Sequence, residues 1–226
     1  MKYSHLFKSR NFYLLLSLVI YFILSPLIIS NHVNNIILSM LMSLIIIVCI
    51  NVVSHSRIAI ISSIVLVPVI ILGYYFLFYA IPTREFFIIH FLSISVLMIV
   101  MTSVVISSVA SQEVITIDTL LGSICGYLLI GLTWSYFYLT IAAYNPNAFS
   151  YHPTNASLRD NVQHFMYFSY VTLTTLGYGD ILPMTDFAKA SSWLETVTGQ
   201  IYLAMWISQL VALHIAQRFR KLRRQK

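Results

Sequence analysis

Residues 175–180 read Thr175-Leu176-Gly177-Tyr178-Gly179-Asp180 and lie between two long apolar segments. The two glycines alternate with larger residues, and glycine adopts positive φ angles without steric cost. A strand whose backbone angles alternate in hand can aim successive carbonyl oxygens at one axis, where they can replace the water shell of a cation. We therefore predict that this stretch is an irregular loop whose shape depends on both glycines.

The composition is that of a membrane protein. Of the 226 residues, 59% are hydrophobic and 9% are charged, and the mean hydropathy is +0.85. A soluble domain carries about 25% charged residues. The net charge of +6 does not indicate nucleic acid, because six of the thirteen basic residues lie in the last nine positions, 218–226. Such a tail is expected next to the membrane, in contact with anionic lipid.

The apolar pattern predicts an all-α membrane protein with six transmembrane helices. A helix needs about 20 apolar residues to cross a bilayer. We expect crossings at 12–30, 36–53, 58–80, 86–110, 119–143 and 187–217. The aromatic-rich stretch 162–174 is too short to cross, so it is expected to re-enter the membrane before the loop at 175–180. Asp118 and Thr119 are the expected cap of the fifth helix.

The basic residues predict the orientation of the chain. Six crossings place both termini on one side of the membrane, and that side collects ten of the thirteen basic residues. Lys and Arg concentrate on the cytoplasmic side. We therefore expect both termini in the cytoplasm of a cell whose plasma (inner) membrane holds the protein, and the loop at 175–180 entering from outside.

Residues 119–217 resemble the pore module of the potassium channel superfamily, with an outer helix, a pore helix, a selectivity filter and an inner helix. The resemblance rests on the aromatic stretch ending at Thr174 and on the Gly-Tyr-Gly-Asp string that follows. It implies passive K⁺ conduction through a homotetramer, with no other cofactor. The implied K⁺ ligands are the backbone carbonyls of Thr175, Leu176, Gly177 and Tyr178, in a filter that ends at Gly179.

The resemblance also implies a set of residues that support the filter: Asp180, Tyr167, Phe168, Val171 and Thr174. We expect the Tyr167 hydroxyl to donate a hydrogen bond to Asp180. Leu176 stands where the commonest family string has valine. Because the carbonyl is what coordinates the ion, we expect K⁺ selectivity to survive this difference.

The last helix carries the expected gate. Gly199 lies 20 residues after Gly179, where the family's inner helix has its gating hinge, although close packing of helices is an alternative reading of this glycine. Leu203 and Ile207 follow at i+4 and i+8 and are candidate cavity-lining residues. Glu195, near the top of the same helix, is expected to face the pore mouth or a water pocket behind the filter.

Residues 1–116 form the predicted four-helix domain that precedes the pore domain, 117–226. Their position matches that of a voltage sensor in topology only. A voltage sensor needs several arginines in its fourth helix, whereas residues 86–110 contain no Arg or Lys and only one other ionisable residue, His90. We therefore expect little or no voltage dependence.

Other functions fit the sequence less well. A nonselective or sodium-permeable channel is disfavoured by the intact Gly-Tyr-Gly string, and a subunit of a potassium uptake transporter is disfavoured because such chains repeat four filter loops. An enzyme is disfavoured because the seven histidines are scattered without metal-ligand spacing.

Overall fold

The computed structural model describes residues 9–25, 32–52, 56–79, 83–112, 114–150 and 161–223. Within these ranges the chain forms helices joined by loops, with one isolated β-bridge. The helices are α1 Arg10–Leu24, α2 His32–Val52, α3 Arg57–Tyr79, α4 Arg84–Ala110, α5 Ile117–Tyr144, α6 Asn161–Leu173 and α7 Asp186–Arg223. Each predicted apolar stretch overlaps one helix, and the aromatic-rich stretch forms α6. Residues 26–30, the end of the first predicted crossing, lie outside the described ranges. The all-α prediction is confirmed for the described residues.

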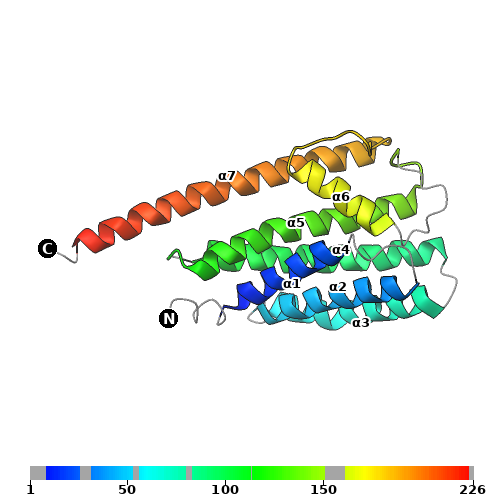
Figure 1. Ribbon diagram of the computed structural model, residues 1–226, viewed down its shortest axis with the longest axis horizontal. Coiled ribbons are helices and arrows are strands. Elements are labelled where there is room, and N and C mark those ends of the chain that lie inside the picture. The colour runs from blue at the N-terminus through cyan, green and yellow to red at the C-terminus, as the bar shows by residue number, and fades with distance from the viewer. Residues whose placement is uncertain are drawn as a thin grey trace.

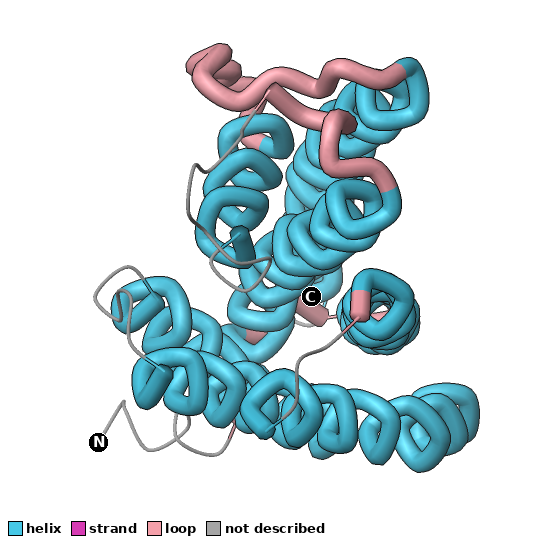
Figure 2. Tube along the Cα trace, turned by 90° about the vertical axis from the view of Figure 1, so that its right-hand side faces the viewer, coloured by secondary structure: helices cyan, strands magenta, loops and turns pink. Residues whose placement is uncertain are grey.

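The start of the first helix, α1, and the end of the last helix, α7, lie at the same end of the molecule. In Figure 1 the start of α1 and the end of α7 lie on the left, while the end of α5 and the starts of α6 and α7 lie on the right. Figure 2 views the molecule from that right-hand end, where the loops around α6 gather. The short helix α6 lies between α5 and the first half of α7.

Helix α5 is the centre of the packing, and it contacts α1, α4, α6 and α7. Gly122 lets α5 and α4 approach closely, because a Cβ at this position would lie 2.6 Å from Val109 Cγ2 of α4. Gly126 lets α5 and α7 approach closely, because a Cβ there would lie 2.6 Å from Tyr202 Oη of α7. One cluster of buried apolar side chains extends from Leu14 of α1 to Phe168 of α6. The two sequence halves therefore share a core.

Several described helices are suited to a membrane. By length and composition, residues 57–74 of α3 and the whole of α4 and α5 can cross a bilayer. Helix α1 and residues 40–52 of α2 are shorter apolar helices. The side chains of the basic tail, 218–226, lie outside what the structure describes.

The start of α5 differs from the prediction. Its N-cap is Thr116, whose hydroxyl accepts the Thr119 N–H at 3.1 Å, and the Thr119 hydroxyl in turn accepts the Thr116 N–H at 3.3 Å. This reciprocal arrangement is a capping box. Asp118 instead accepts a hydrogen bond from the Ser9 hydroxyl, so its carboxylate joins the start of α5 to the start of α1.

Candidate functional site

The chain between α5 and α7 enters and leaves the molecule at the same end. Phe149, after α5, forms an antiparallel bridge with Pro183, before α7. The Ser150 N–H donates to the Leu182 carbonyl at 2.8 Å, and the Met184 N–H donates to the Ala148 carbonyl at 2.8 Å. Helix α6 and the loop after it thus form a re-entrant excursion, as Figure 1 shows.

The backbone of residues 175–179 alternates in hand. Gly177 and Gly179 have φ angles of 59° and 78°, and Thr175 has a φ of 60°. The positive φ of the two glycines was predicted, but that of Thr175 was not. A non-glycine residue in this region costs on the order of 1–3 kcal/mol. Hydrogen bonds hold Thr175 there, from its N–H to the Thr172 carbonyl at 3.0 Å and from its hydroxyl to the Thr174 carbonyl at 2.6 Å.

The end of α6 anchors the base of this strand. The Val171 carbonyl accepts the N–H groups of Leu176 at 2.9 Å and of Gly177 at 3.3 Å. Thr174 also bonds to α6, because its N–H and its hydroxyl donate to the Tyr170 carbonyl at 3.1 Å and 2.6 Å. The C-terminal end of a helix carries partial negative charge. The base of the strand is therefore a place where a cation is favoured.

A second contact holds the outer end of the strand. The Tyr167 hydroxyl donates to Asp180 Oδ2 at 2.8 Å, as predicted. The rings of Tyr167 and Tyr178 stack with centroids 6.4 Å apart. The Tyr167 hydroxyl holds the pKa of the Asp180 carboxyl below its usual range, and the same bond raises the pKa of Tyr167. The strand is thus attached to α6 at both ends.

Aromatic side chains hold α6 against α5 on the side away from the strand. Phe168 is buried, and its ring centroid lies 5.0 Å from that of Tyr138 and 5.5 Å from that of Phe149. Phe165 adds an edge contact to Phe149 at 4.9 Å. Phe168 thus supports α6 from behind.

Gly199 lies at a close approach between α7 and α6. A Cβ on Gly199 would lie 2.7 Å from the Leu173 carbonyl oxygen, a backbone atom. Helix α7 continues through this position. This contact supports the alternative that Gly199 serves close helix packing, and its role as a hinge stays a prediction. Leu203 and Ile207 are 39% and 63% exposed, and their place in a cavity also stays a prediction.

Glu195 differs from the expectation. Its side chain is fully buried and faces neither a pore mouth nor open water. The Tyr138 hydroxyl of α5 donates to Glu195 Oε2 at 2.6 Å, and the Ser169 hydroxyl of α6 lies 2.5 Å from Oε1. A sequence signal for this burial exists in helical spacing, because α7 buries a stripe of residues: Ala188, Ser191, Glu195, Gly199, Tyr202 and Trp206.

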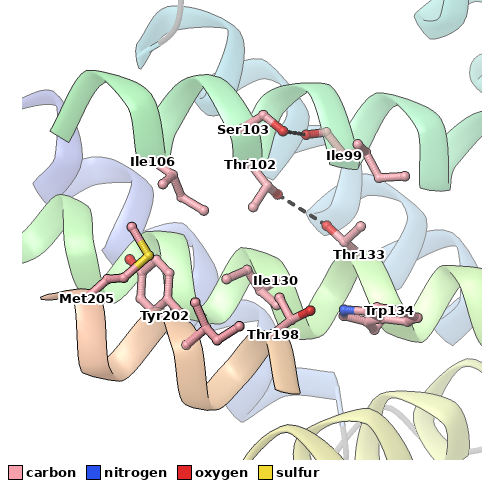
Figure 3. A pocket seen from close by; sticks show the side chains of 11 residues that line it. Ile99, Thr102, Ser103, Ile106, Ile130, Thr133, Trp134, Thr198, Tyr202 and Met205 are labelled. Atoms are coloured by element: carbon pink, nitrogen blue, oxygen red, sulfur yellow. Dashed lines mark hydrogen bonds between the residues drawn. The ribbon is translucent and has the colours of Figure 1, made fainter. Parts of the chain in front are cut away.

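A groove of about 370 Å³ lies between α4, α5 and α7 (Figure 3). Its walls are mostly apolar, and the Thr102 and Thr133 hydroxyls form a hydrogen bond of 3.2 Å at its edge. Apolar walls offer few oxygen ligands to a cation, and the candidate site is therefore at residues 175–180.

A single chain leaves the candidate site uncovered. Leu176 and Tyr178 are 55% and 67% exposed, and Ile201 and Met205 on α7 are exposed as well. In a membrane protein, exposed apolar side chains contact lipid or another protein surface. The strand and this side of α7 are thus the exposed parts of the candidate site.

One family comparison covers this region. Residues 127–215, about two fifths of the 226 residues, match a family model described as "Ion channel". The matched segment contains α6, the strand at 175–180 and most of α5 and α7. Neither a curated protein nor a solved structure matches the chain. The match supports an ion channel of the membrane and a non-enzymatic role.

Proposed function

We propose that the protein is a potassium-selective channel that conducts K⁺ passively. The observation that carries the proposal is the strand at 175–179, in which positive φ angles alternate at Thr175, Gly177 and Gly179. This alternation is what lets successive carbonyl oxygens face one axis, and rings of backbone carbonyls replace the hydration shell of K⁺ in potassium channels.

The proposed mechanism follows from the geometry of the strand. K⁺ loses water at the outer mouth, near Tyr178, and exchanges between the carbonyl sites of residues 175–178 until a following ion displaces it. The C-terminal end of α6 favours the ion at the base of the strand. Tyr167 and Asp180 keep the outer end of the strand in place.

The proposed assembly is a homotetramer. One chain supplies one strand, and a complete ring needs four strands. The exposed Leu176 and Tyr178, and the exposed apolar side of α7, are surfaces that neighbouring copies would cover. We place the tetramer in the plasma (inner) membrane with both termini in the cytoplasm, because ten of thirteen basic residues fall on that side.

The gating proposals concern α4 and α7. Because α4 has no Arg or Lys from Phe86 to Ala110, it offers no gating charge, and we propose little or no voltage dependence. Gly199 is the proposed hinge, and Leu203 and Ile207 are the proposed cavity wall. Anionic lipid is the proposed partner of the basic tail, 218–226.

Flux measurements on the purified protein in liposomes test the proposal. We expect K⁺ flux that barium blocks, a reversal potential in mixed K⁺ and Na⁺ that follows K⁺, and a shallow conductance–voltage curve. Leu176→Val, which restores the commonest family string, serves as a matched variant that keeps K⁺ selectivity. Near-equal permeability to Na⁺ would overturn selectivity, and a steep voltage dependence would overturn the interpretation of α4.

A further inference from the structure

Glu195 is a buried carboxyl that the conduction mechanism does not use. It lies on α7 and faces α5 and α6, and its side chain has no exposed surface. The titratable groups that face it are phenols: Tyr138 and Tyr127 on α5, and Tyr170 on α6. In the part of the chain that the structure describes, no basic side chain lies within ion-pair distance of it. A buried carboxylate without a cation is strongly disfavoured, and such a group takes up a proton instead.

The hydrogen bonds around Ser169 also indicate that the Glu195 carboxyl is protonated. The Ser169 oxygen lies 2.8 Å from the Gly131 carbonyl oxygen and 2.5 Å from Glu195 Oε1. A serine hydroxyl has one hydrogen, and a carbonyl oxygen only accepts. When Ser169 donates to Gly131, the hydrogen between Ser169 and Glu195 must therefore come from Glu195. Tyr138 donates to the other carboxyl oxygen, so a protonated Glu195 satisfies every group.

We propose that Glu195 is a positioning residue for the filter, and that its proton decides whether Ser169 ties α6 to α5 as well as to α7. With the proton, hydrogen bonds run from Tyr138 to Glu195, from Glu195 to Ser169, and from Ser169 to Gly131, so that Ser169 links α6 to both neighbouring helices. Without it, Glu195 only accepts, so Ser169 gives its single hydrogen to the carboxylate and releases Gly131. Ser169 then ties α6 to α7 alone.

This exchange is close enough to the filter to affect it. Ser169 lies two residues before Val171, whose carbonyl anchors the N–H groups of Leu176 and Gly177. At the same place, a Cβ on Gly131 would lie 2.4 Å from the Tyr170 ring, so α5 and α6 are in close contact where the bond to Gly131 forms. Loss of that bond loosens α6 where the strand depends on it.

The inference rests on the proposed function and predicts a pH dependence that belongs to Glu195. With equal pH on both sides of the liposome, we expect barium-sensitive K⁺ flux to fall as the pH rises from about 6.5 to about 9, below the ordinary range of phenols. We expect a decrease of about fivefold or more, the low end of typical coupling between two equilibria. Glu195→Gln keeps both hydrogen bonds, since its amide donates to Ser169 and accepts from Tyr138, so its flux stays high and independent of pH.

Two further variants distinguish this exchange from a merely structural role. Ser169→Ala removes the hydroxyl that changes partners, and we expect it to abolish the pH dependence even though Glu195 remains. Tyr138→Phe changes only the other carboxyl oxygen and is expected to retain it. If Glu195→Gln or Ser169→Ala responds to pH as the wild type does, the inference is wrong while the barium-sensitive flux leaves the proposed function intact. If no variant and no wild-type protein conducts K⁺ at any pH, the proposed function fails and the inference with it.

Discussion

Three buried serines of the first half and the buried polar group around Glu195 in the second half form different kinds of hydrogen bond. In α1, α3 and α4 the buried serines Ser17, Ser63 and Ser95 donate to carbonyls of their own helix. In the second half, Tyr138 and Ser169 both reach Glu195, and so connect α5, α6 and α7. The first kind of bond adds little to how helices sit against each other, whereas the second defines their relative positions.

The difference shows in which half the helices must be placed precisely relative to one another. Apolar packing determines which helix faces meet, and it tolerates changes of shape when the volume is kept. Hydrogen bonds between helices demand donor and acceptor within a few tenths of an ångström. The half that carries the candidate filter has such bonds behind it, at Ser169, and at its outer end, at Tyr167. Changes there should matter more than similar changes in α1–α4.

The largest effect is expected from Gly177→Ala. Gly177 has a φ of 59°, and a Cβ there would meet nothing within 4 Å of its own chain. The effect is therefore one of backbone strain, of about 1–2 kcal/mol per chain, repeated in each chain of the proposed ring. We expect K⁺ flux and the preference for K⁺ over Na⁺ to be lost, as measured by flux and reversal potential. Retained selectivity would show that the alternating backbone is not the filter.

The next effect concerns Gly199→Ala. Its Cβ would lie 2.7 Å from the Leu173 carbonyl oxygen, so α7 and α6 must separate, at a typical cost of about 1–3 kcal/mol. We expect a lower unfolding temperature and reduced flux. A hinge alone predicts another result, in which open probability falls and thermal stability does not. Ala204→Gly, on the exposed side of α7, is a control that adds flexibility without removing a contact.

A matched pair of serines tests the comparison directly. Ser169 and Ser95 are both buried, but only Ser169 bonds to other helices. Ser169→Ala leaves Glu195 without that partner, which costs about 1–3 kcal/mol, and we expect Ser95→Ala to change the free energy of unfolding by less than about 0.5 kcal/mol. Chemical unfolding in detergent measures both. Equal losses would mean that the two halves do not differ in this way.

Tyr167→Phe is expected to have a smaller effect, one that depends on pH. The Tyr167 hydroxyl lowers the pKa of the Asp180 carboxyl, so its contribution is present above the usual Asp range and is lost as the pH falls through the lowered pKa. The Tyr167→Phe variant lacks this contribution at every pH, so it differs from the wild type most at neutral pH, where the wild type has it in full. We expect faster inactivation of K⁺ current at neutral pH in patch recordings, and a difference from the wild type that shrinks under acidic conditions. Unchanged inactivation would show that this bond does not support the filter.

The smallest effect is expected from His90→Leu in α4. His90 is 2% exposed, and neither ring nitrogen has a hydrogen-bond partner among the residues that the structure describes. Replacing an unsatisfied buried polar group by an apolar one of similar size is neutral or stabilising. We expect the unfolding temperature to stay equal or to rise slightly, with unchanged K⁺ flux. A clear loss of stability would mean that the imidazole of His90 does form a stabilising hydrogen bond in the folded protein.

Much of the architecture was predictable because it depends on local patterns. Apolar runs and turn residues predicted the seven helices, and the spacing of Gly177 and Gly179 predicted their positive φ angles. The contact between Tyr167 and Asp180 was also predictable, from a resemblance that places both beside one short strand. At the start of α5, Thr119 takes part in the cap as predicted, whereas Asp118 does not, because Ser9, distant in sequence, engages it.

The sequence by itself determined that this chain belongs in a membrane, where its helices lie and which short strand has positive φ angles at its two glycines, because each of these depends on residues that are neighbours along the chain. Only the tertiary structure decided what Glu195 does. Its partners Tyr138 and Ser169 lie 57 and 26 residues away, and they meet it only because Gly131 lets α6 approach α5 closely. Helical spacing along α7 indicates that Glu195 lies on the buried side, but no local pattern tells which side chains of other helices become its partners.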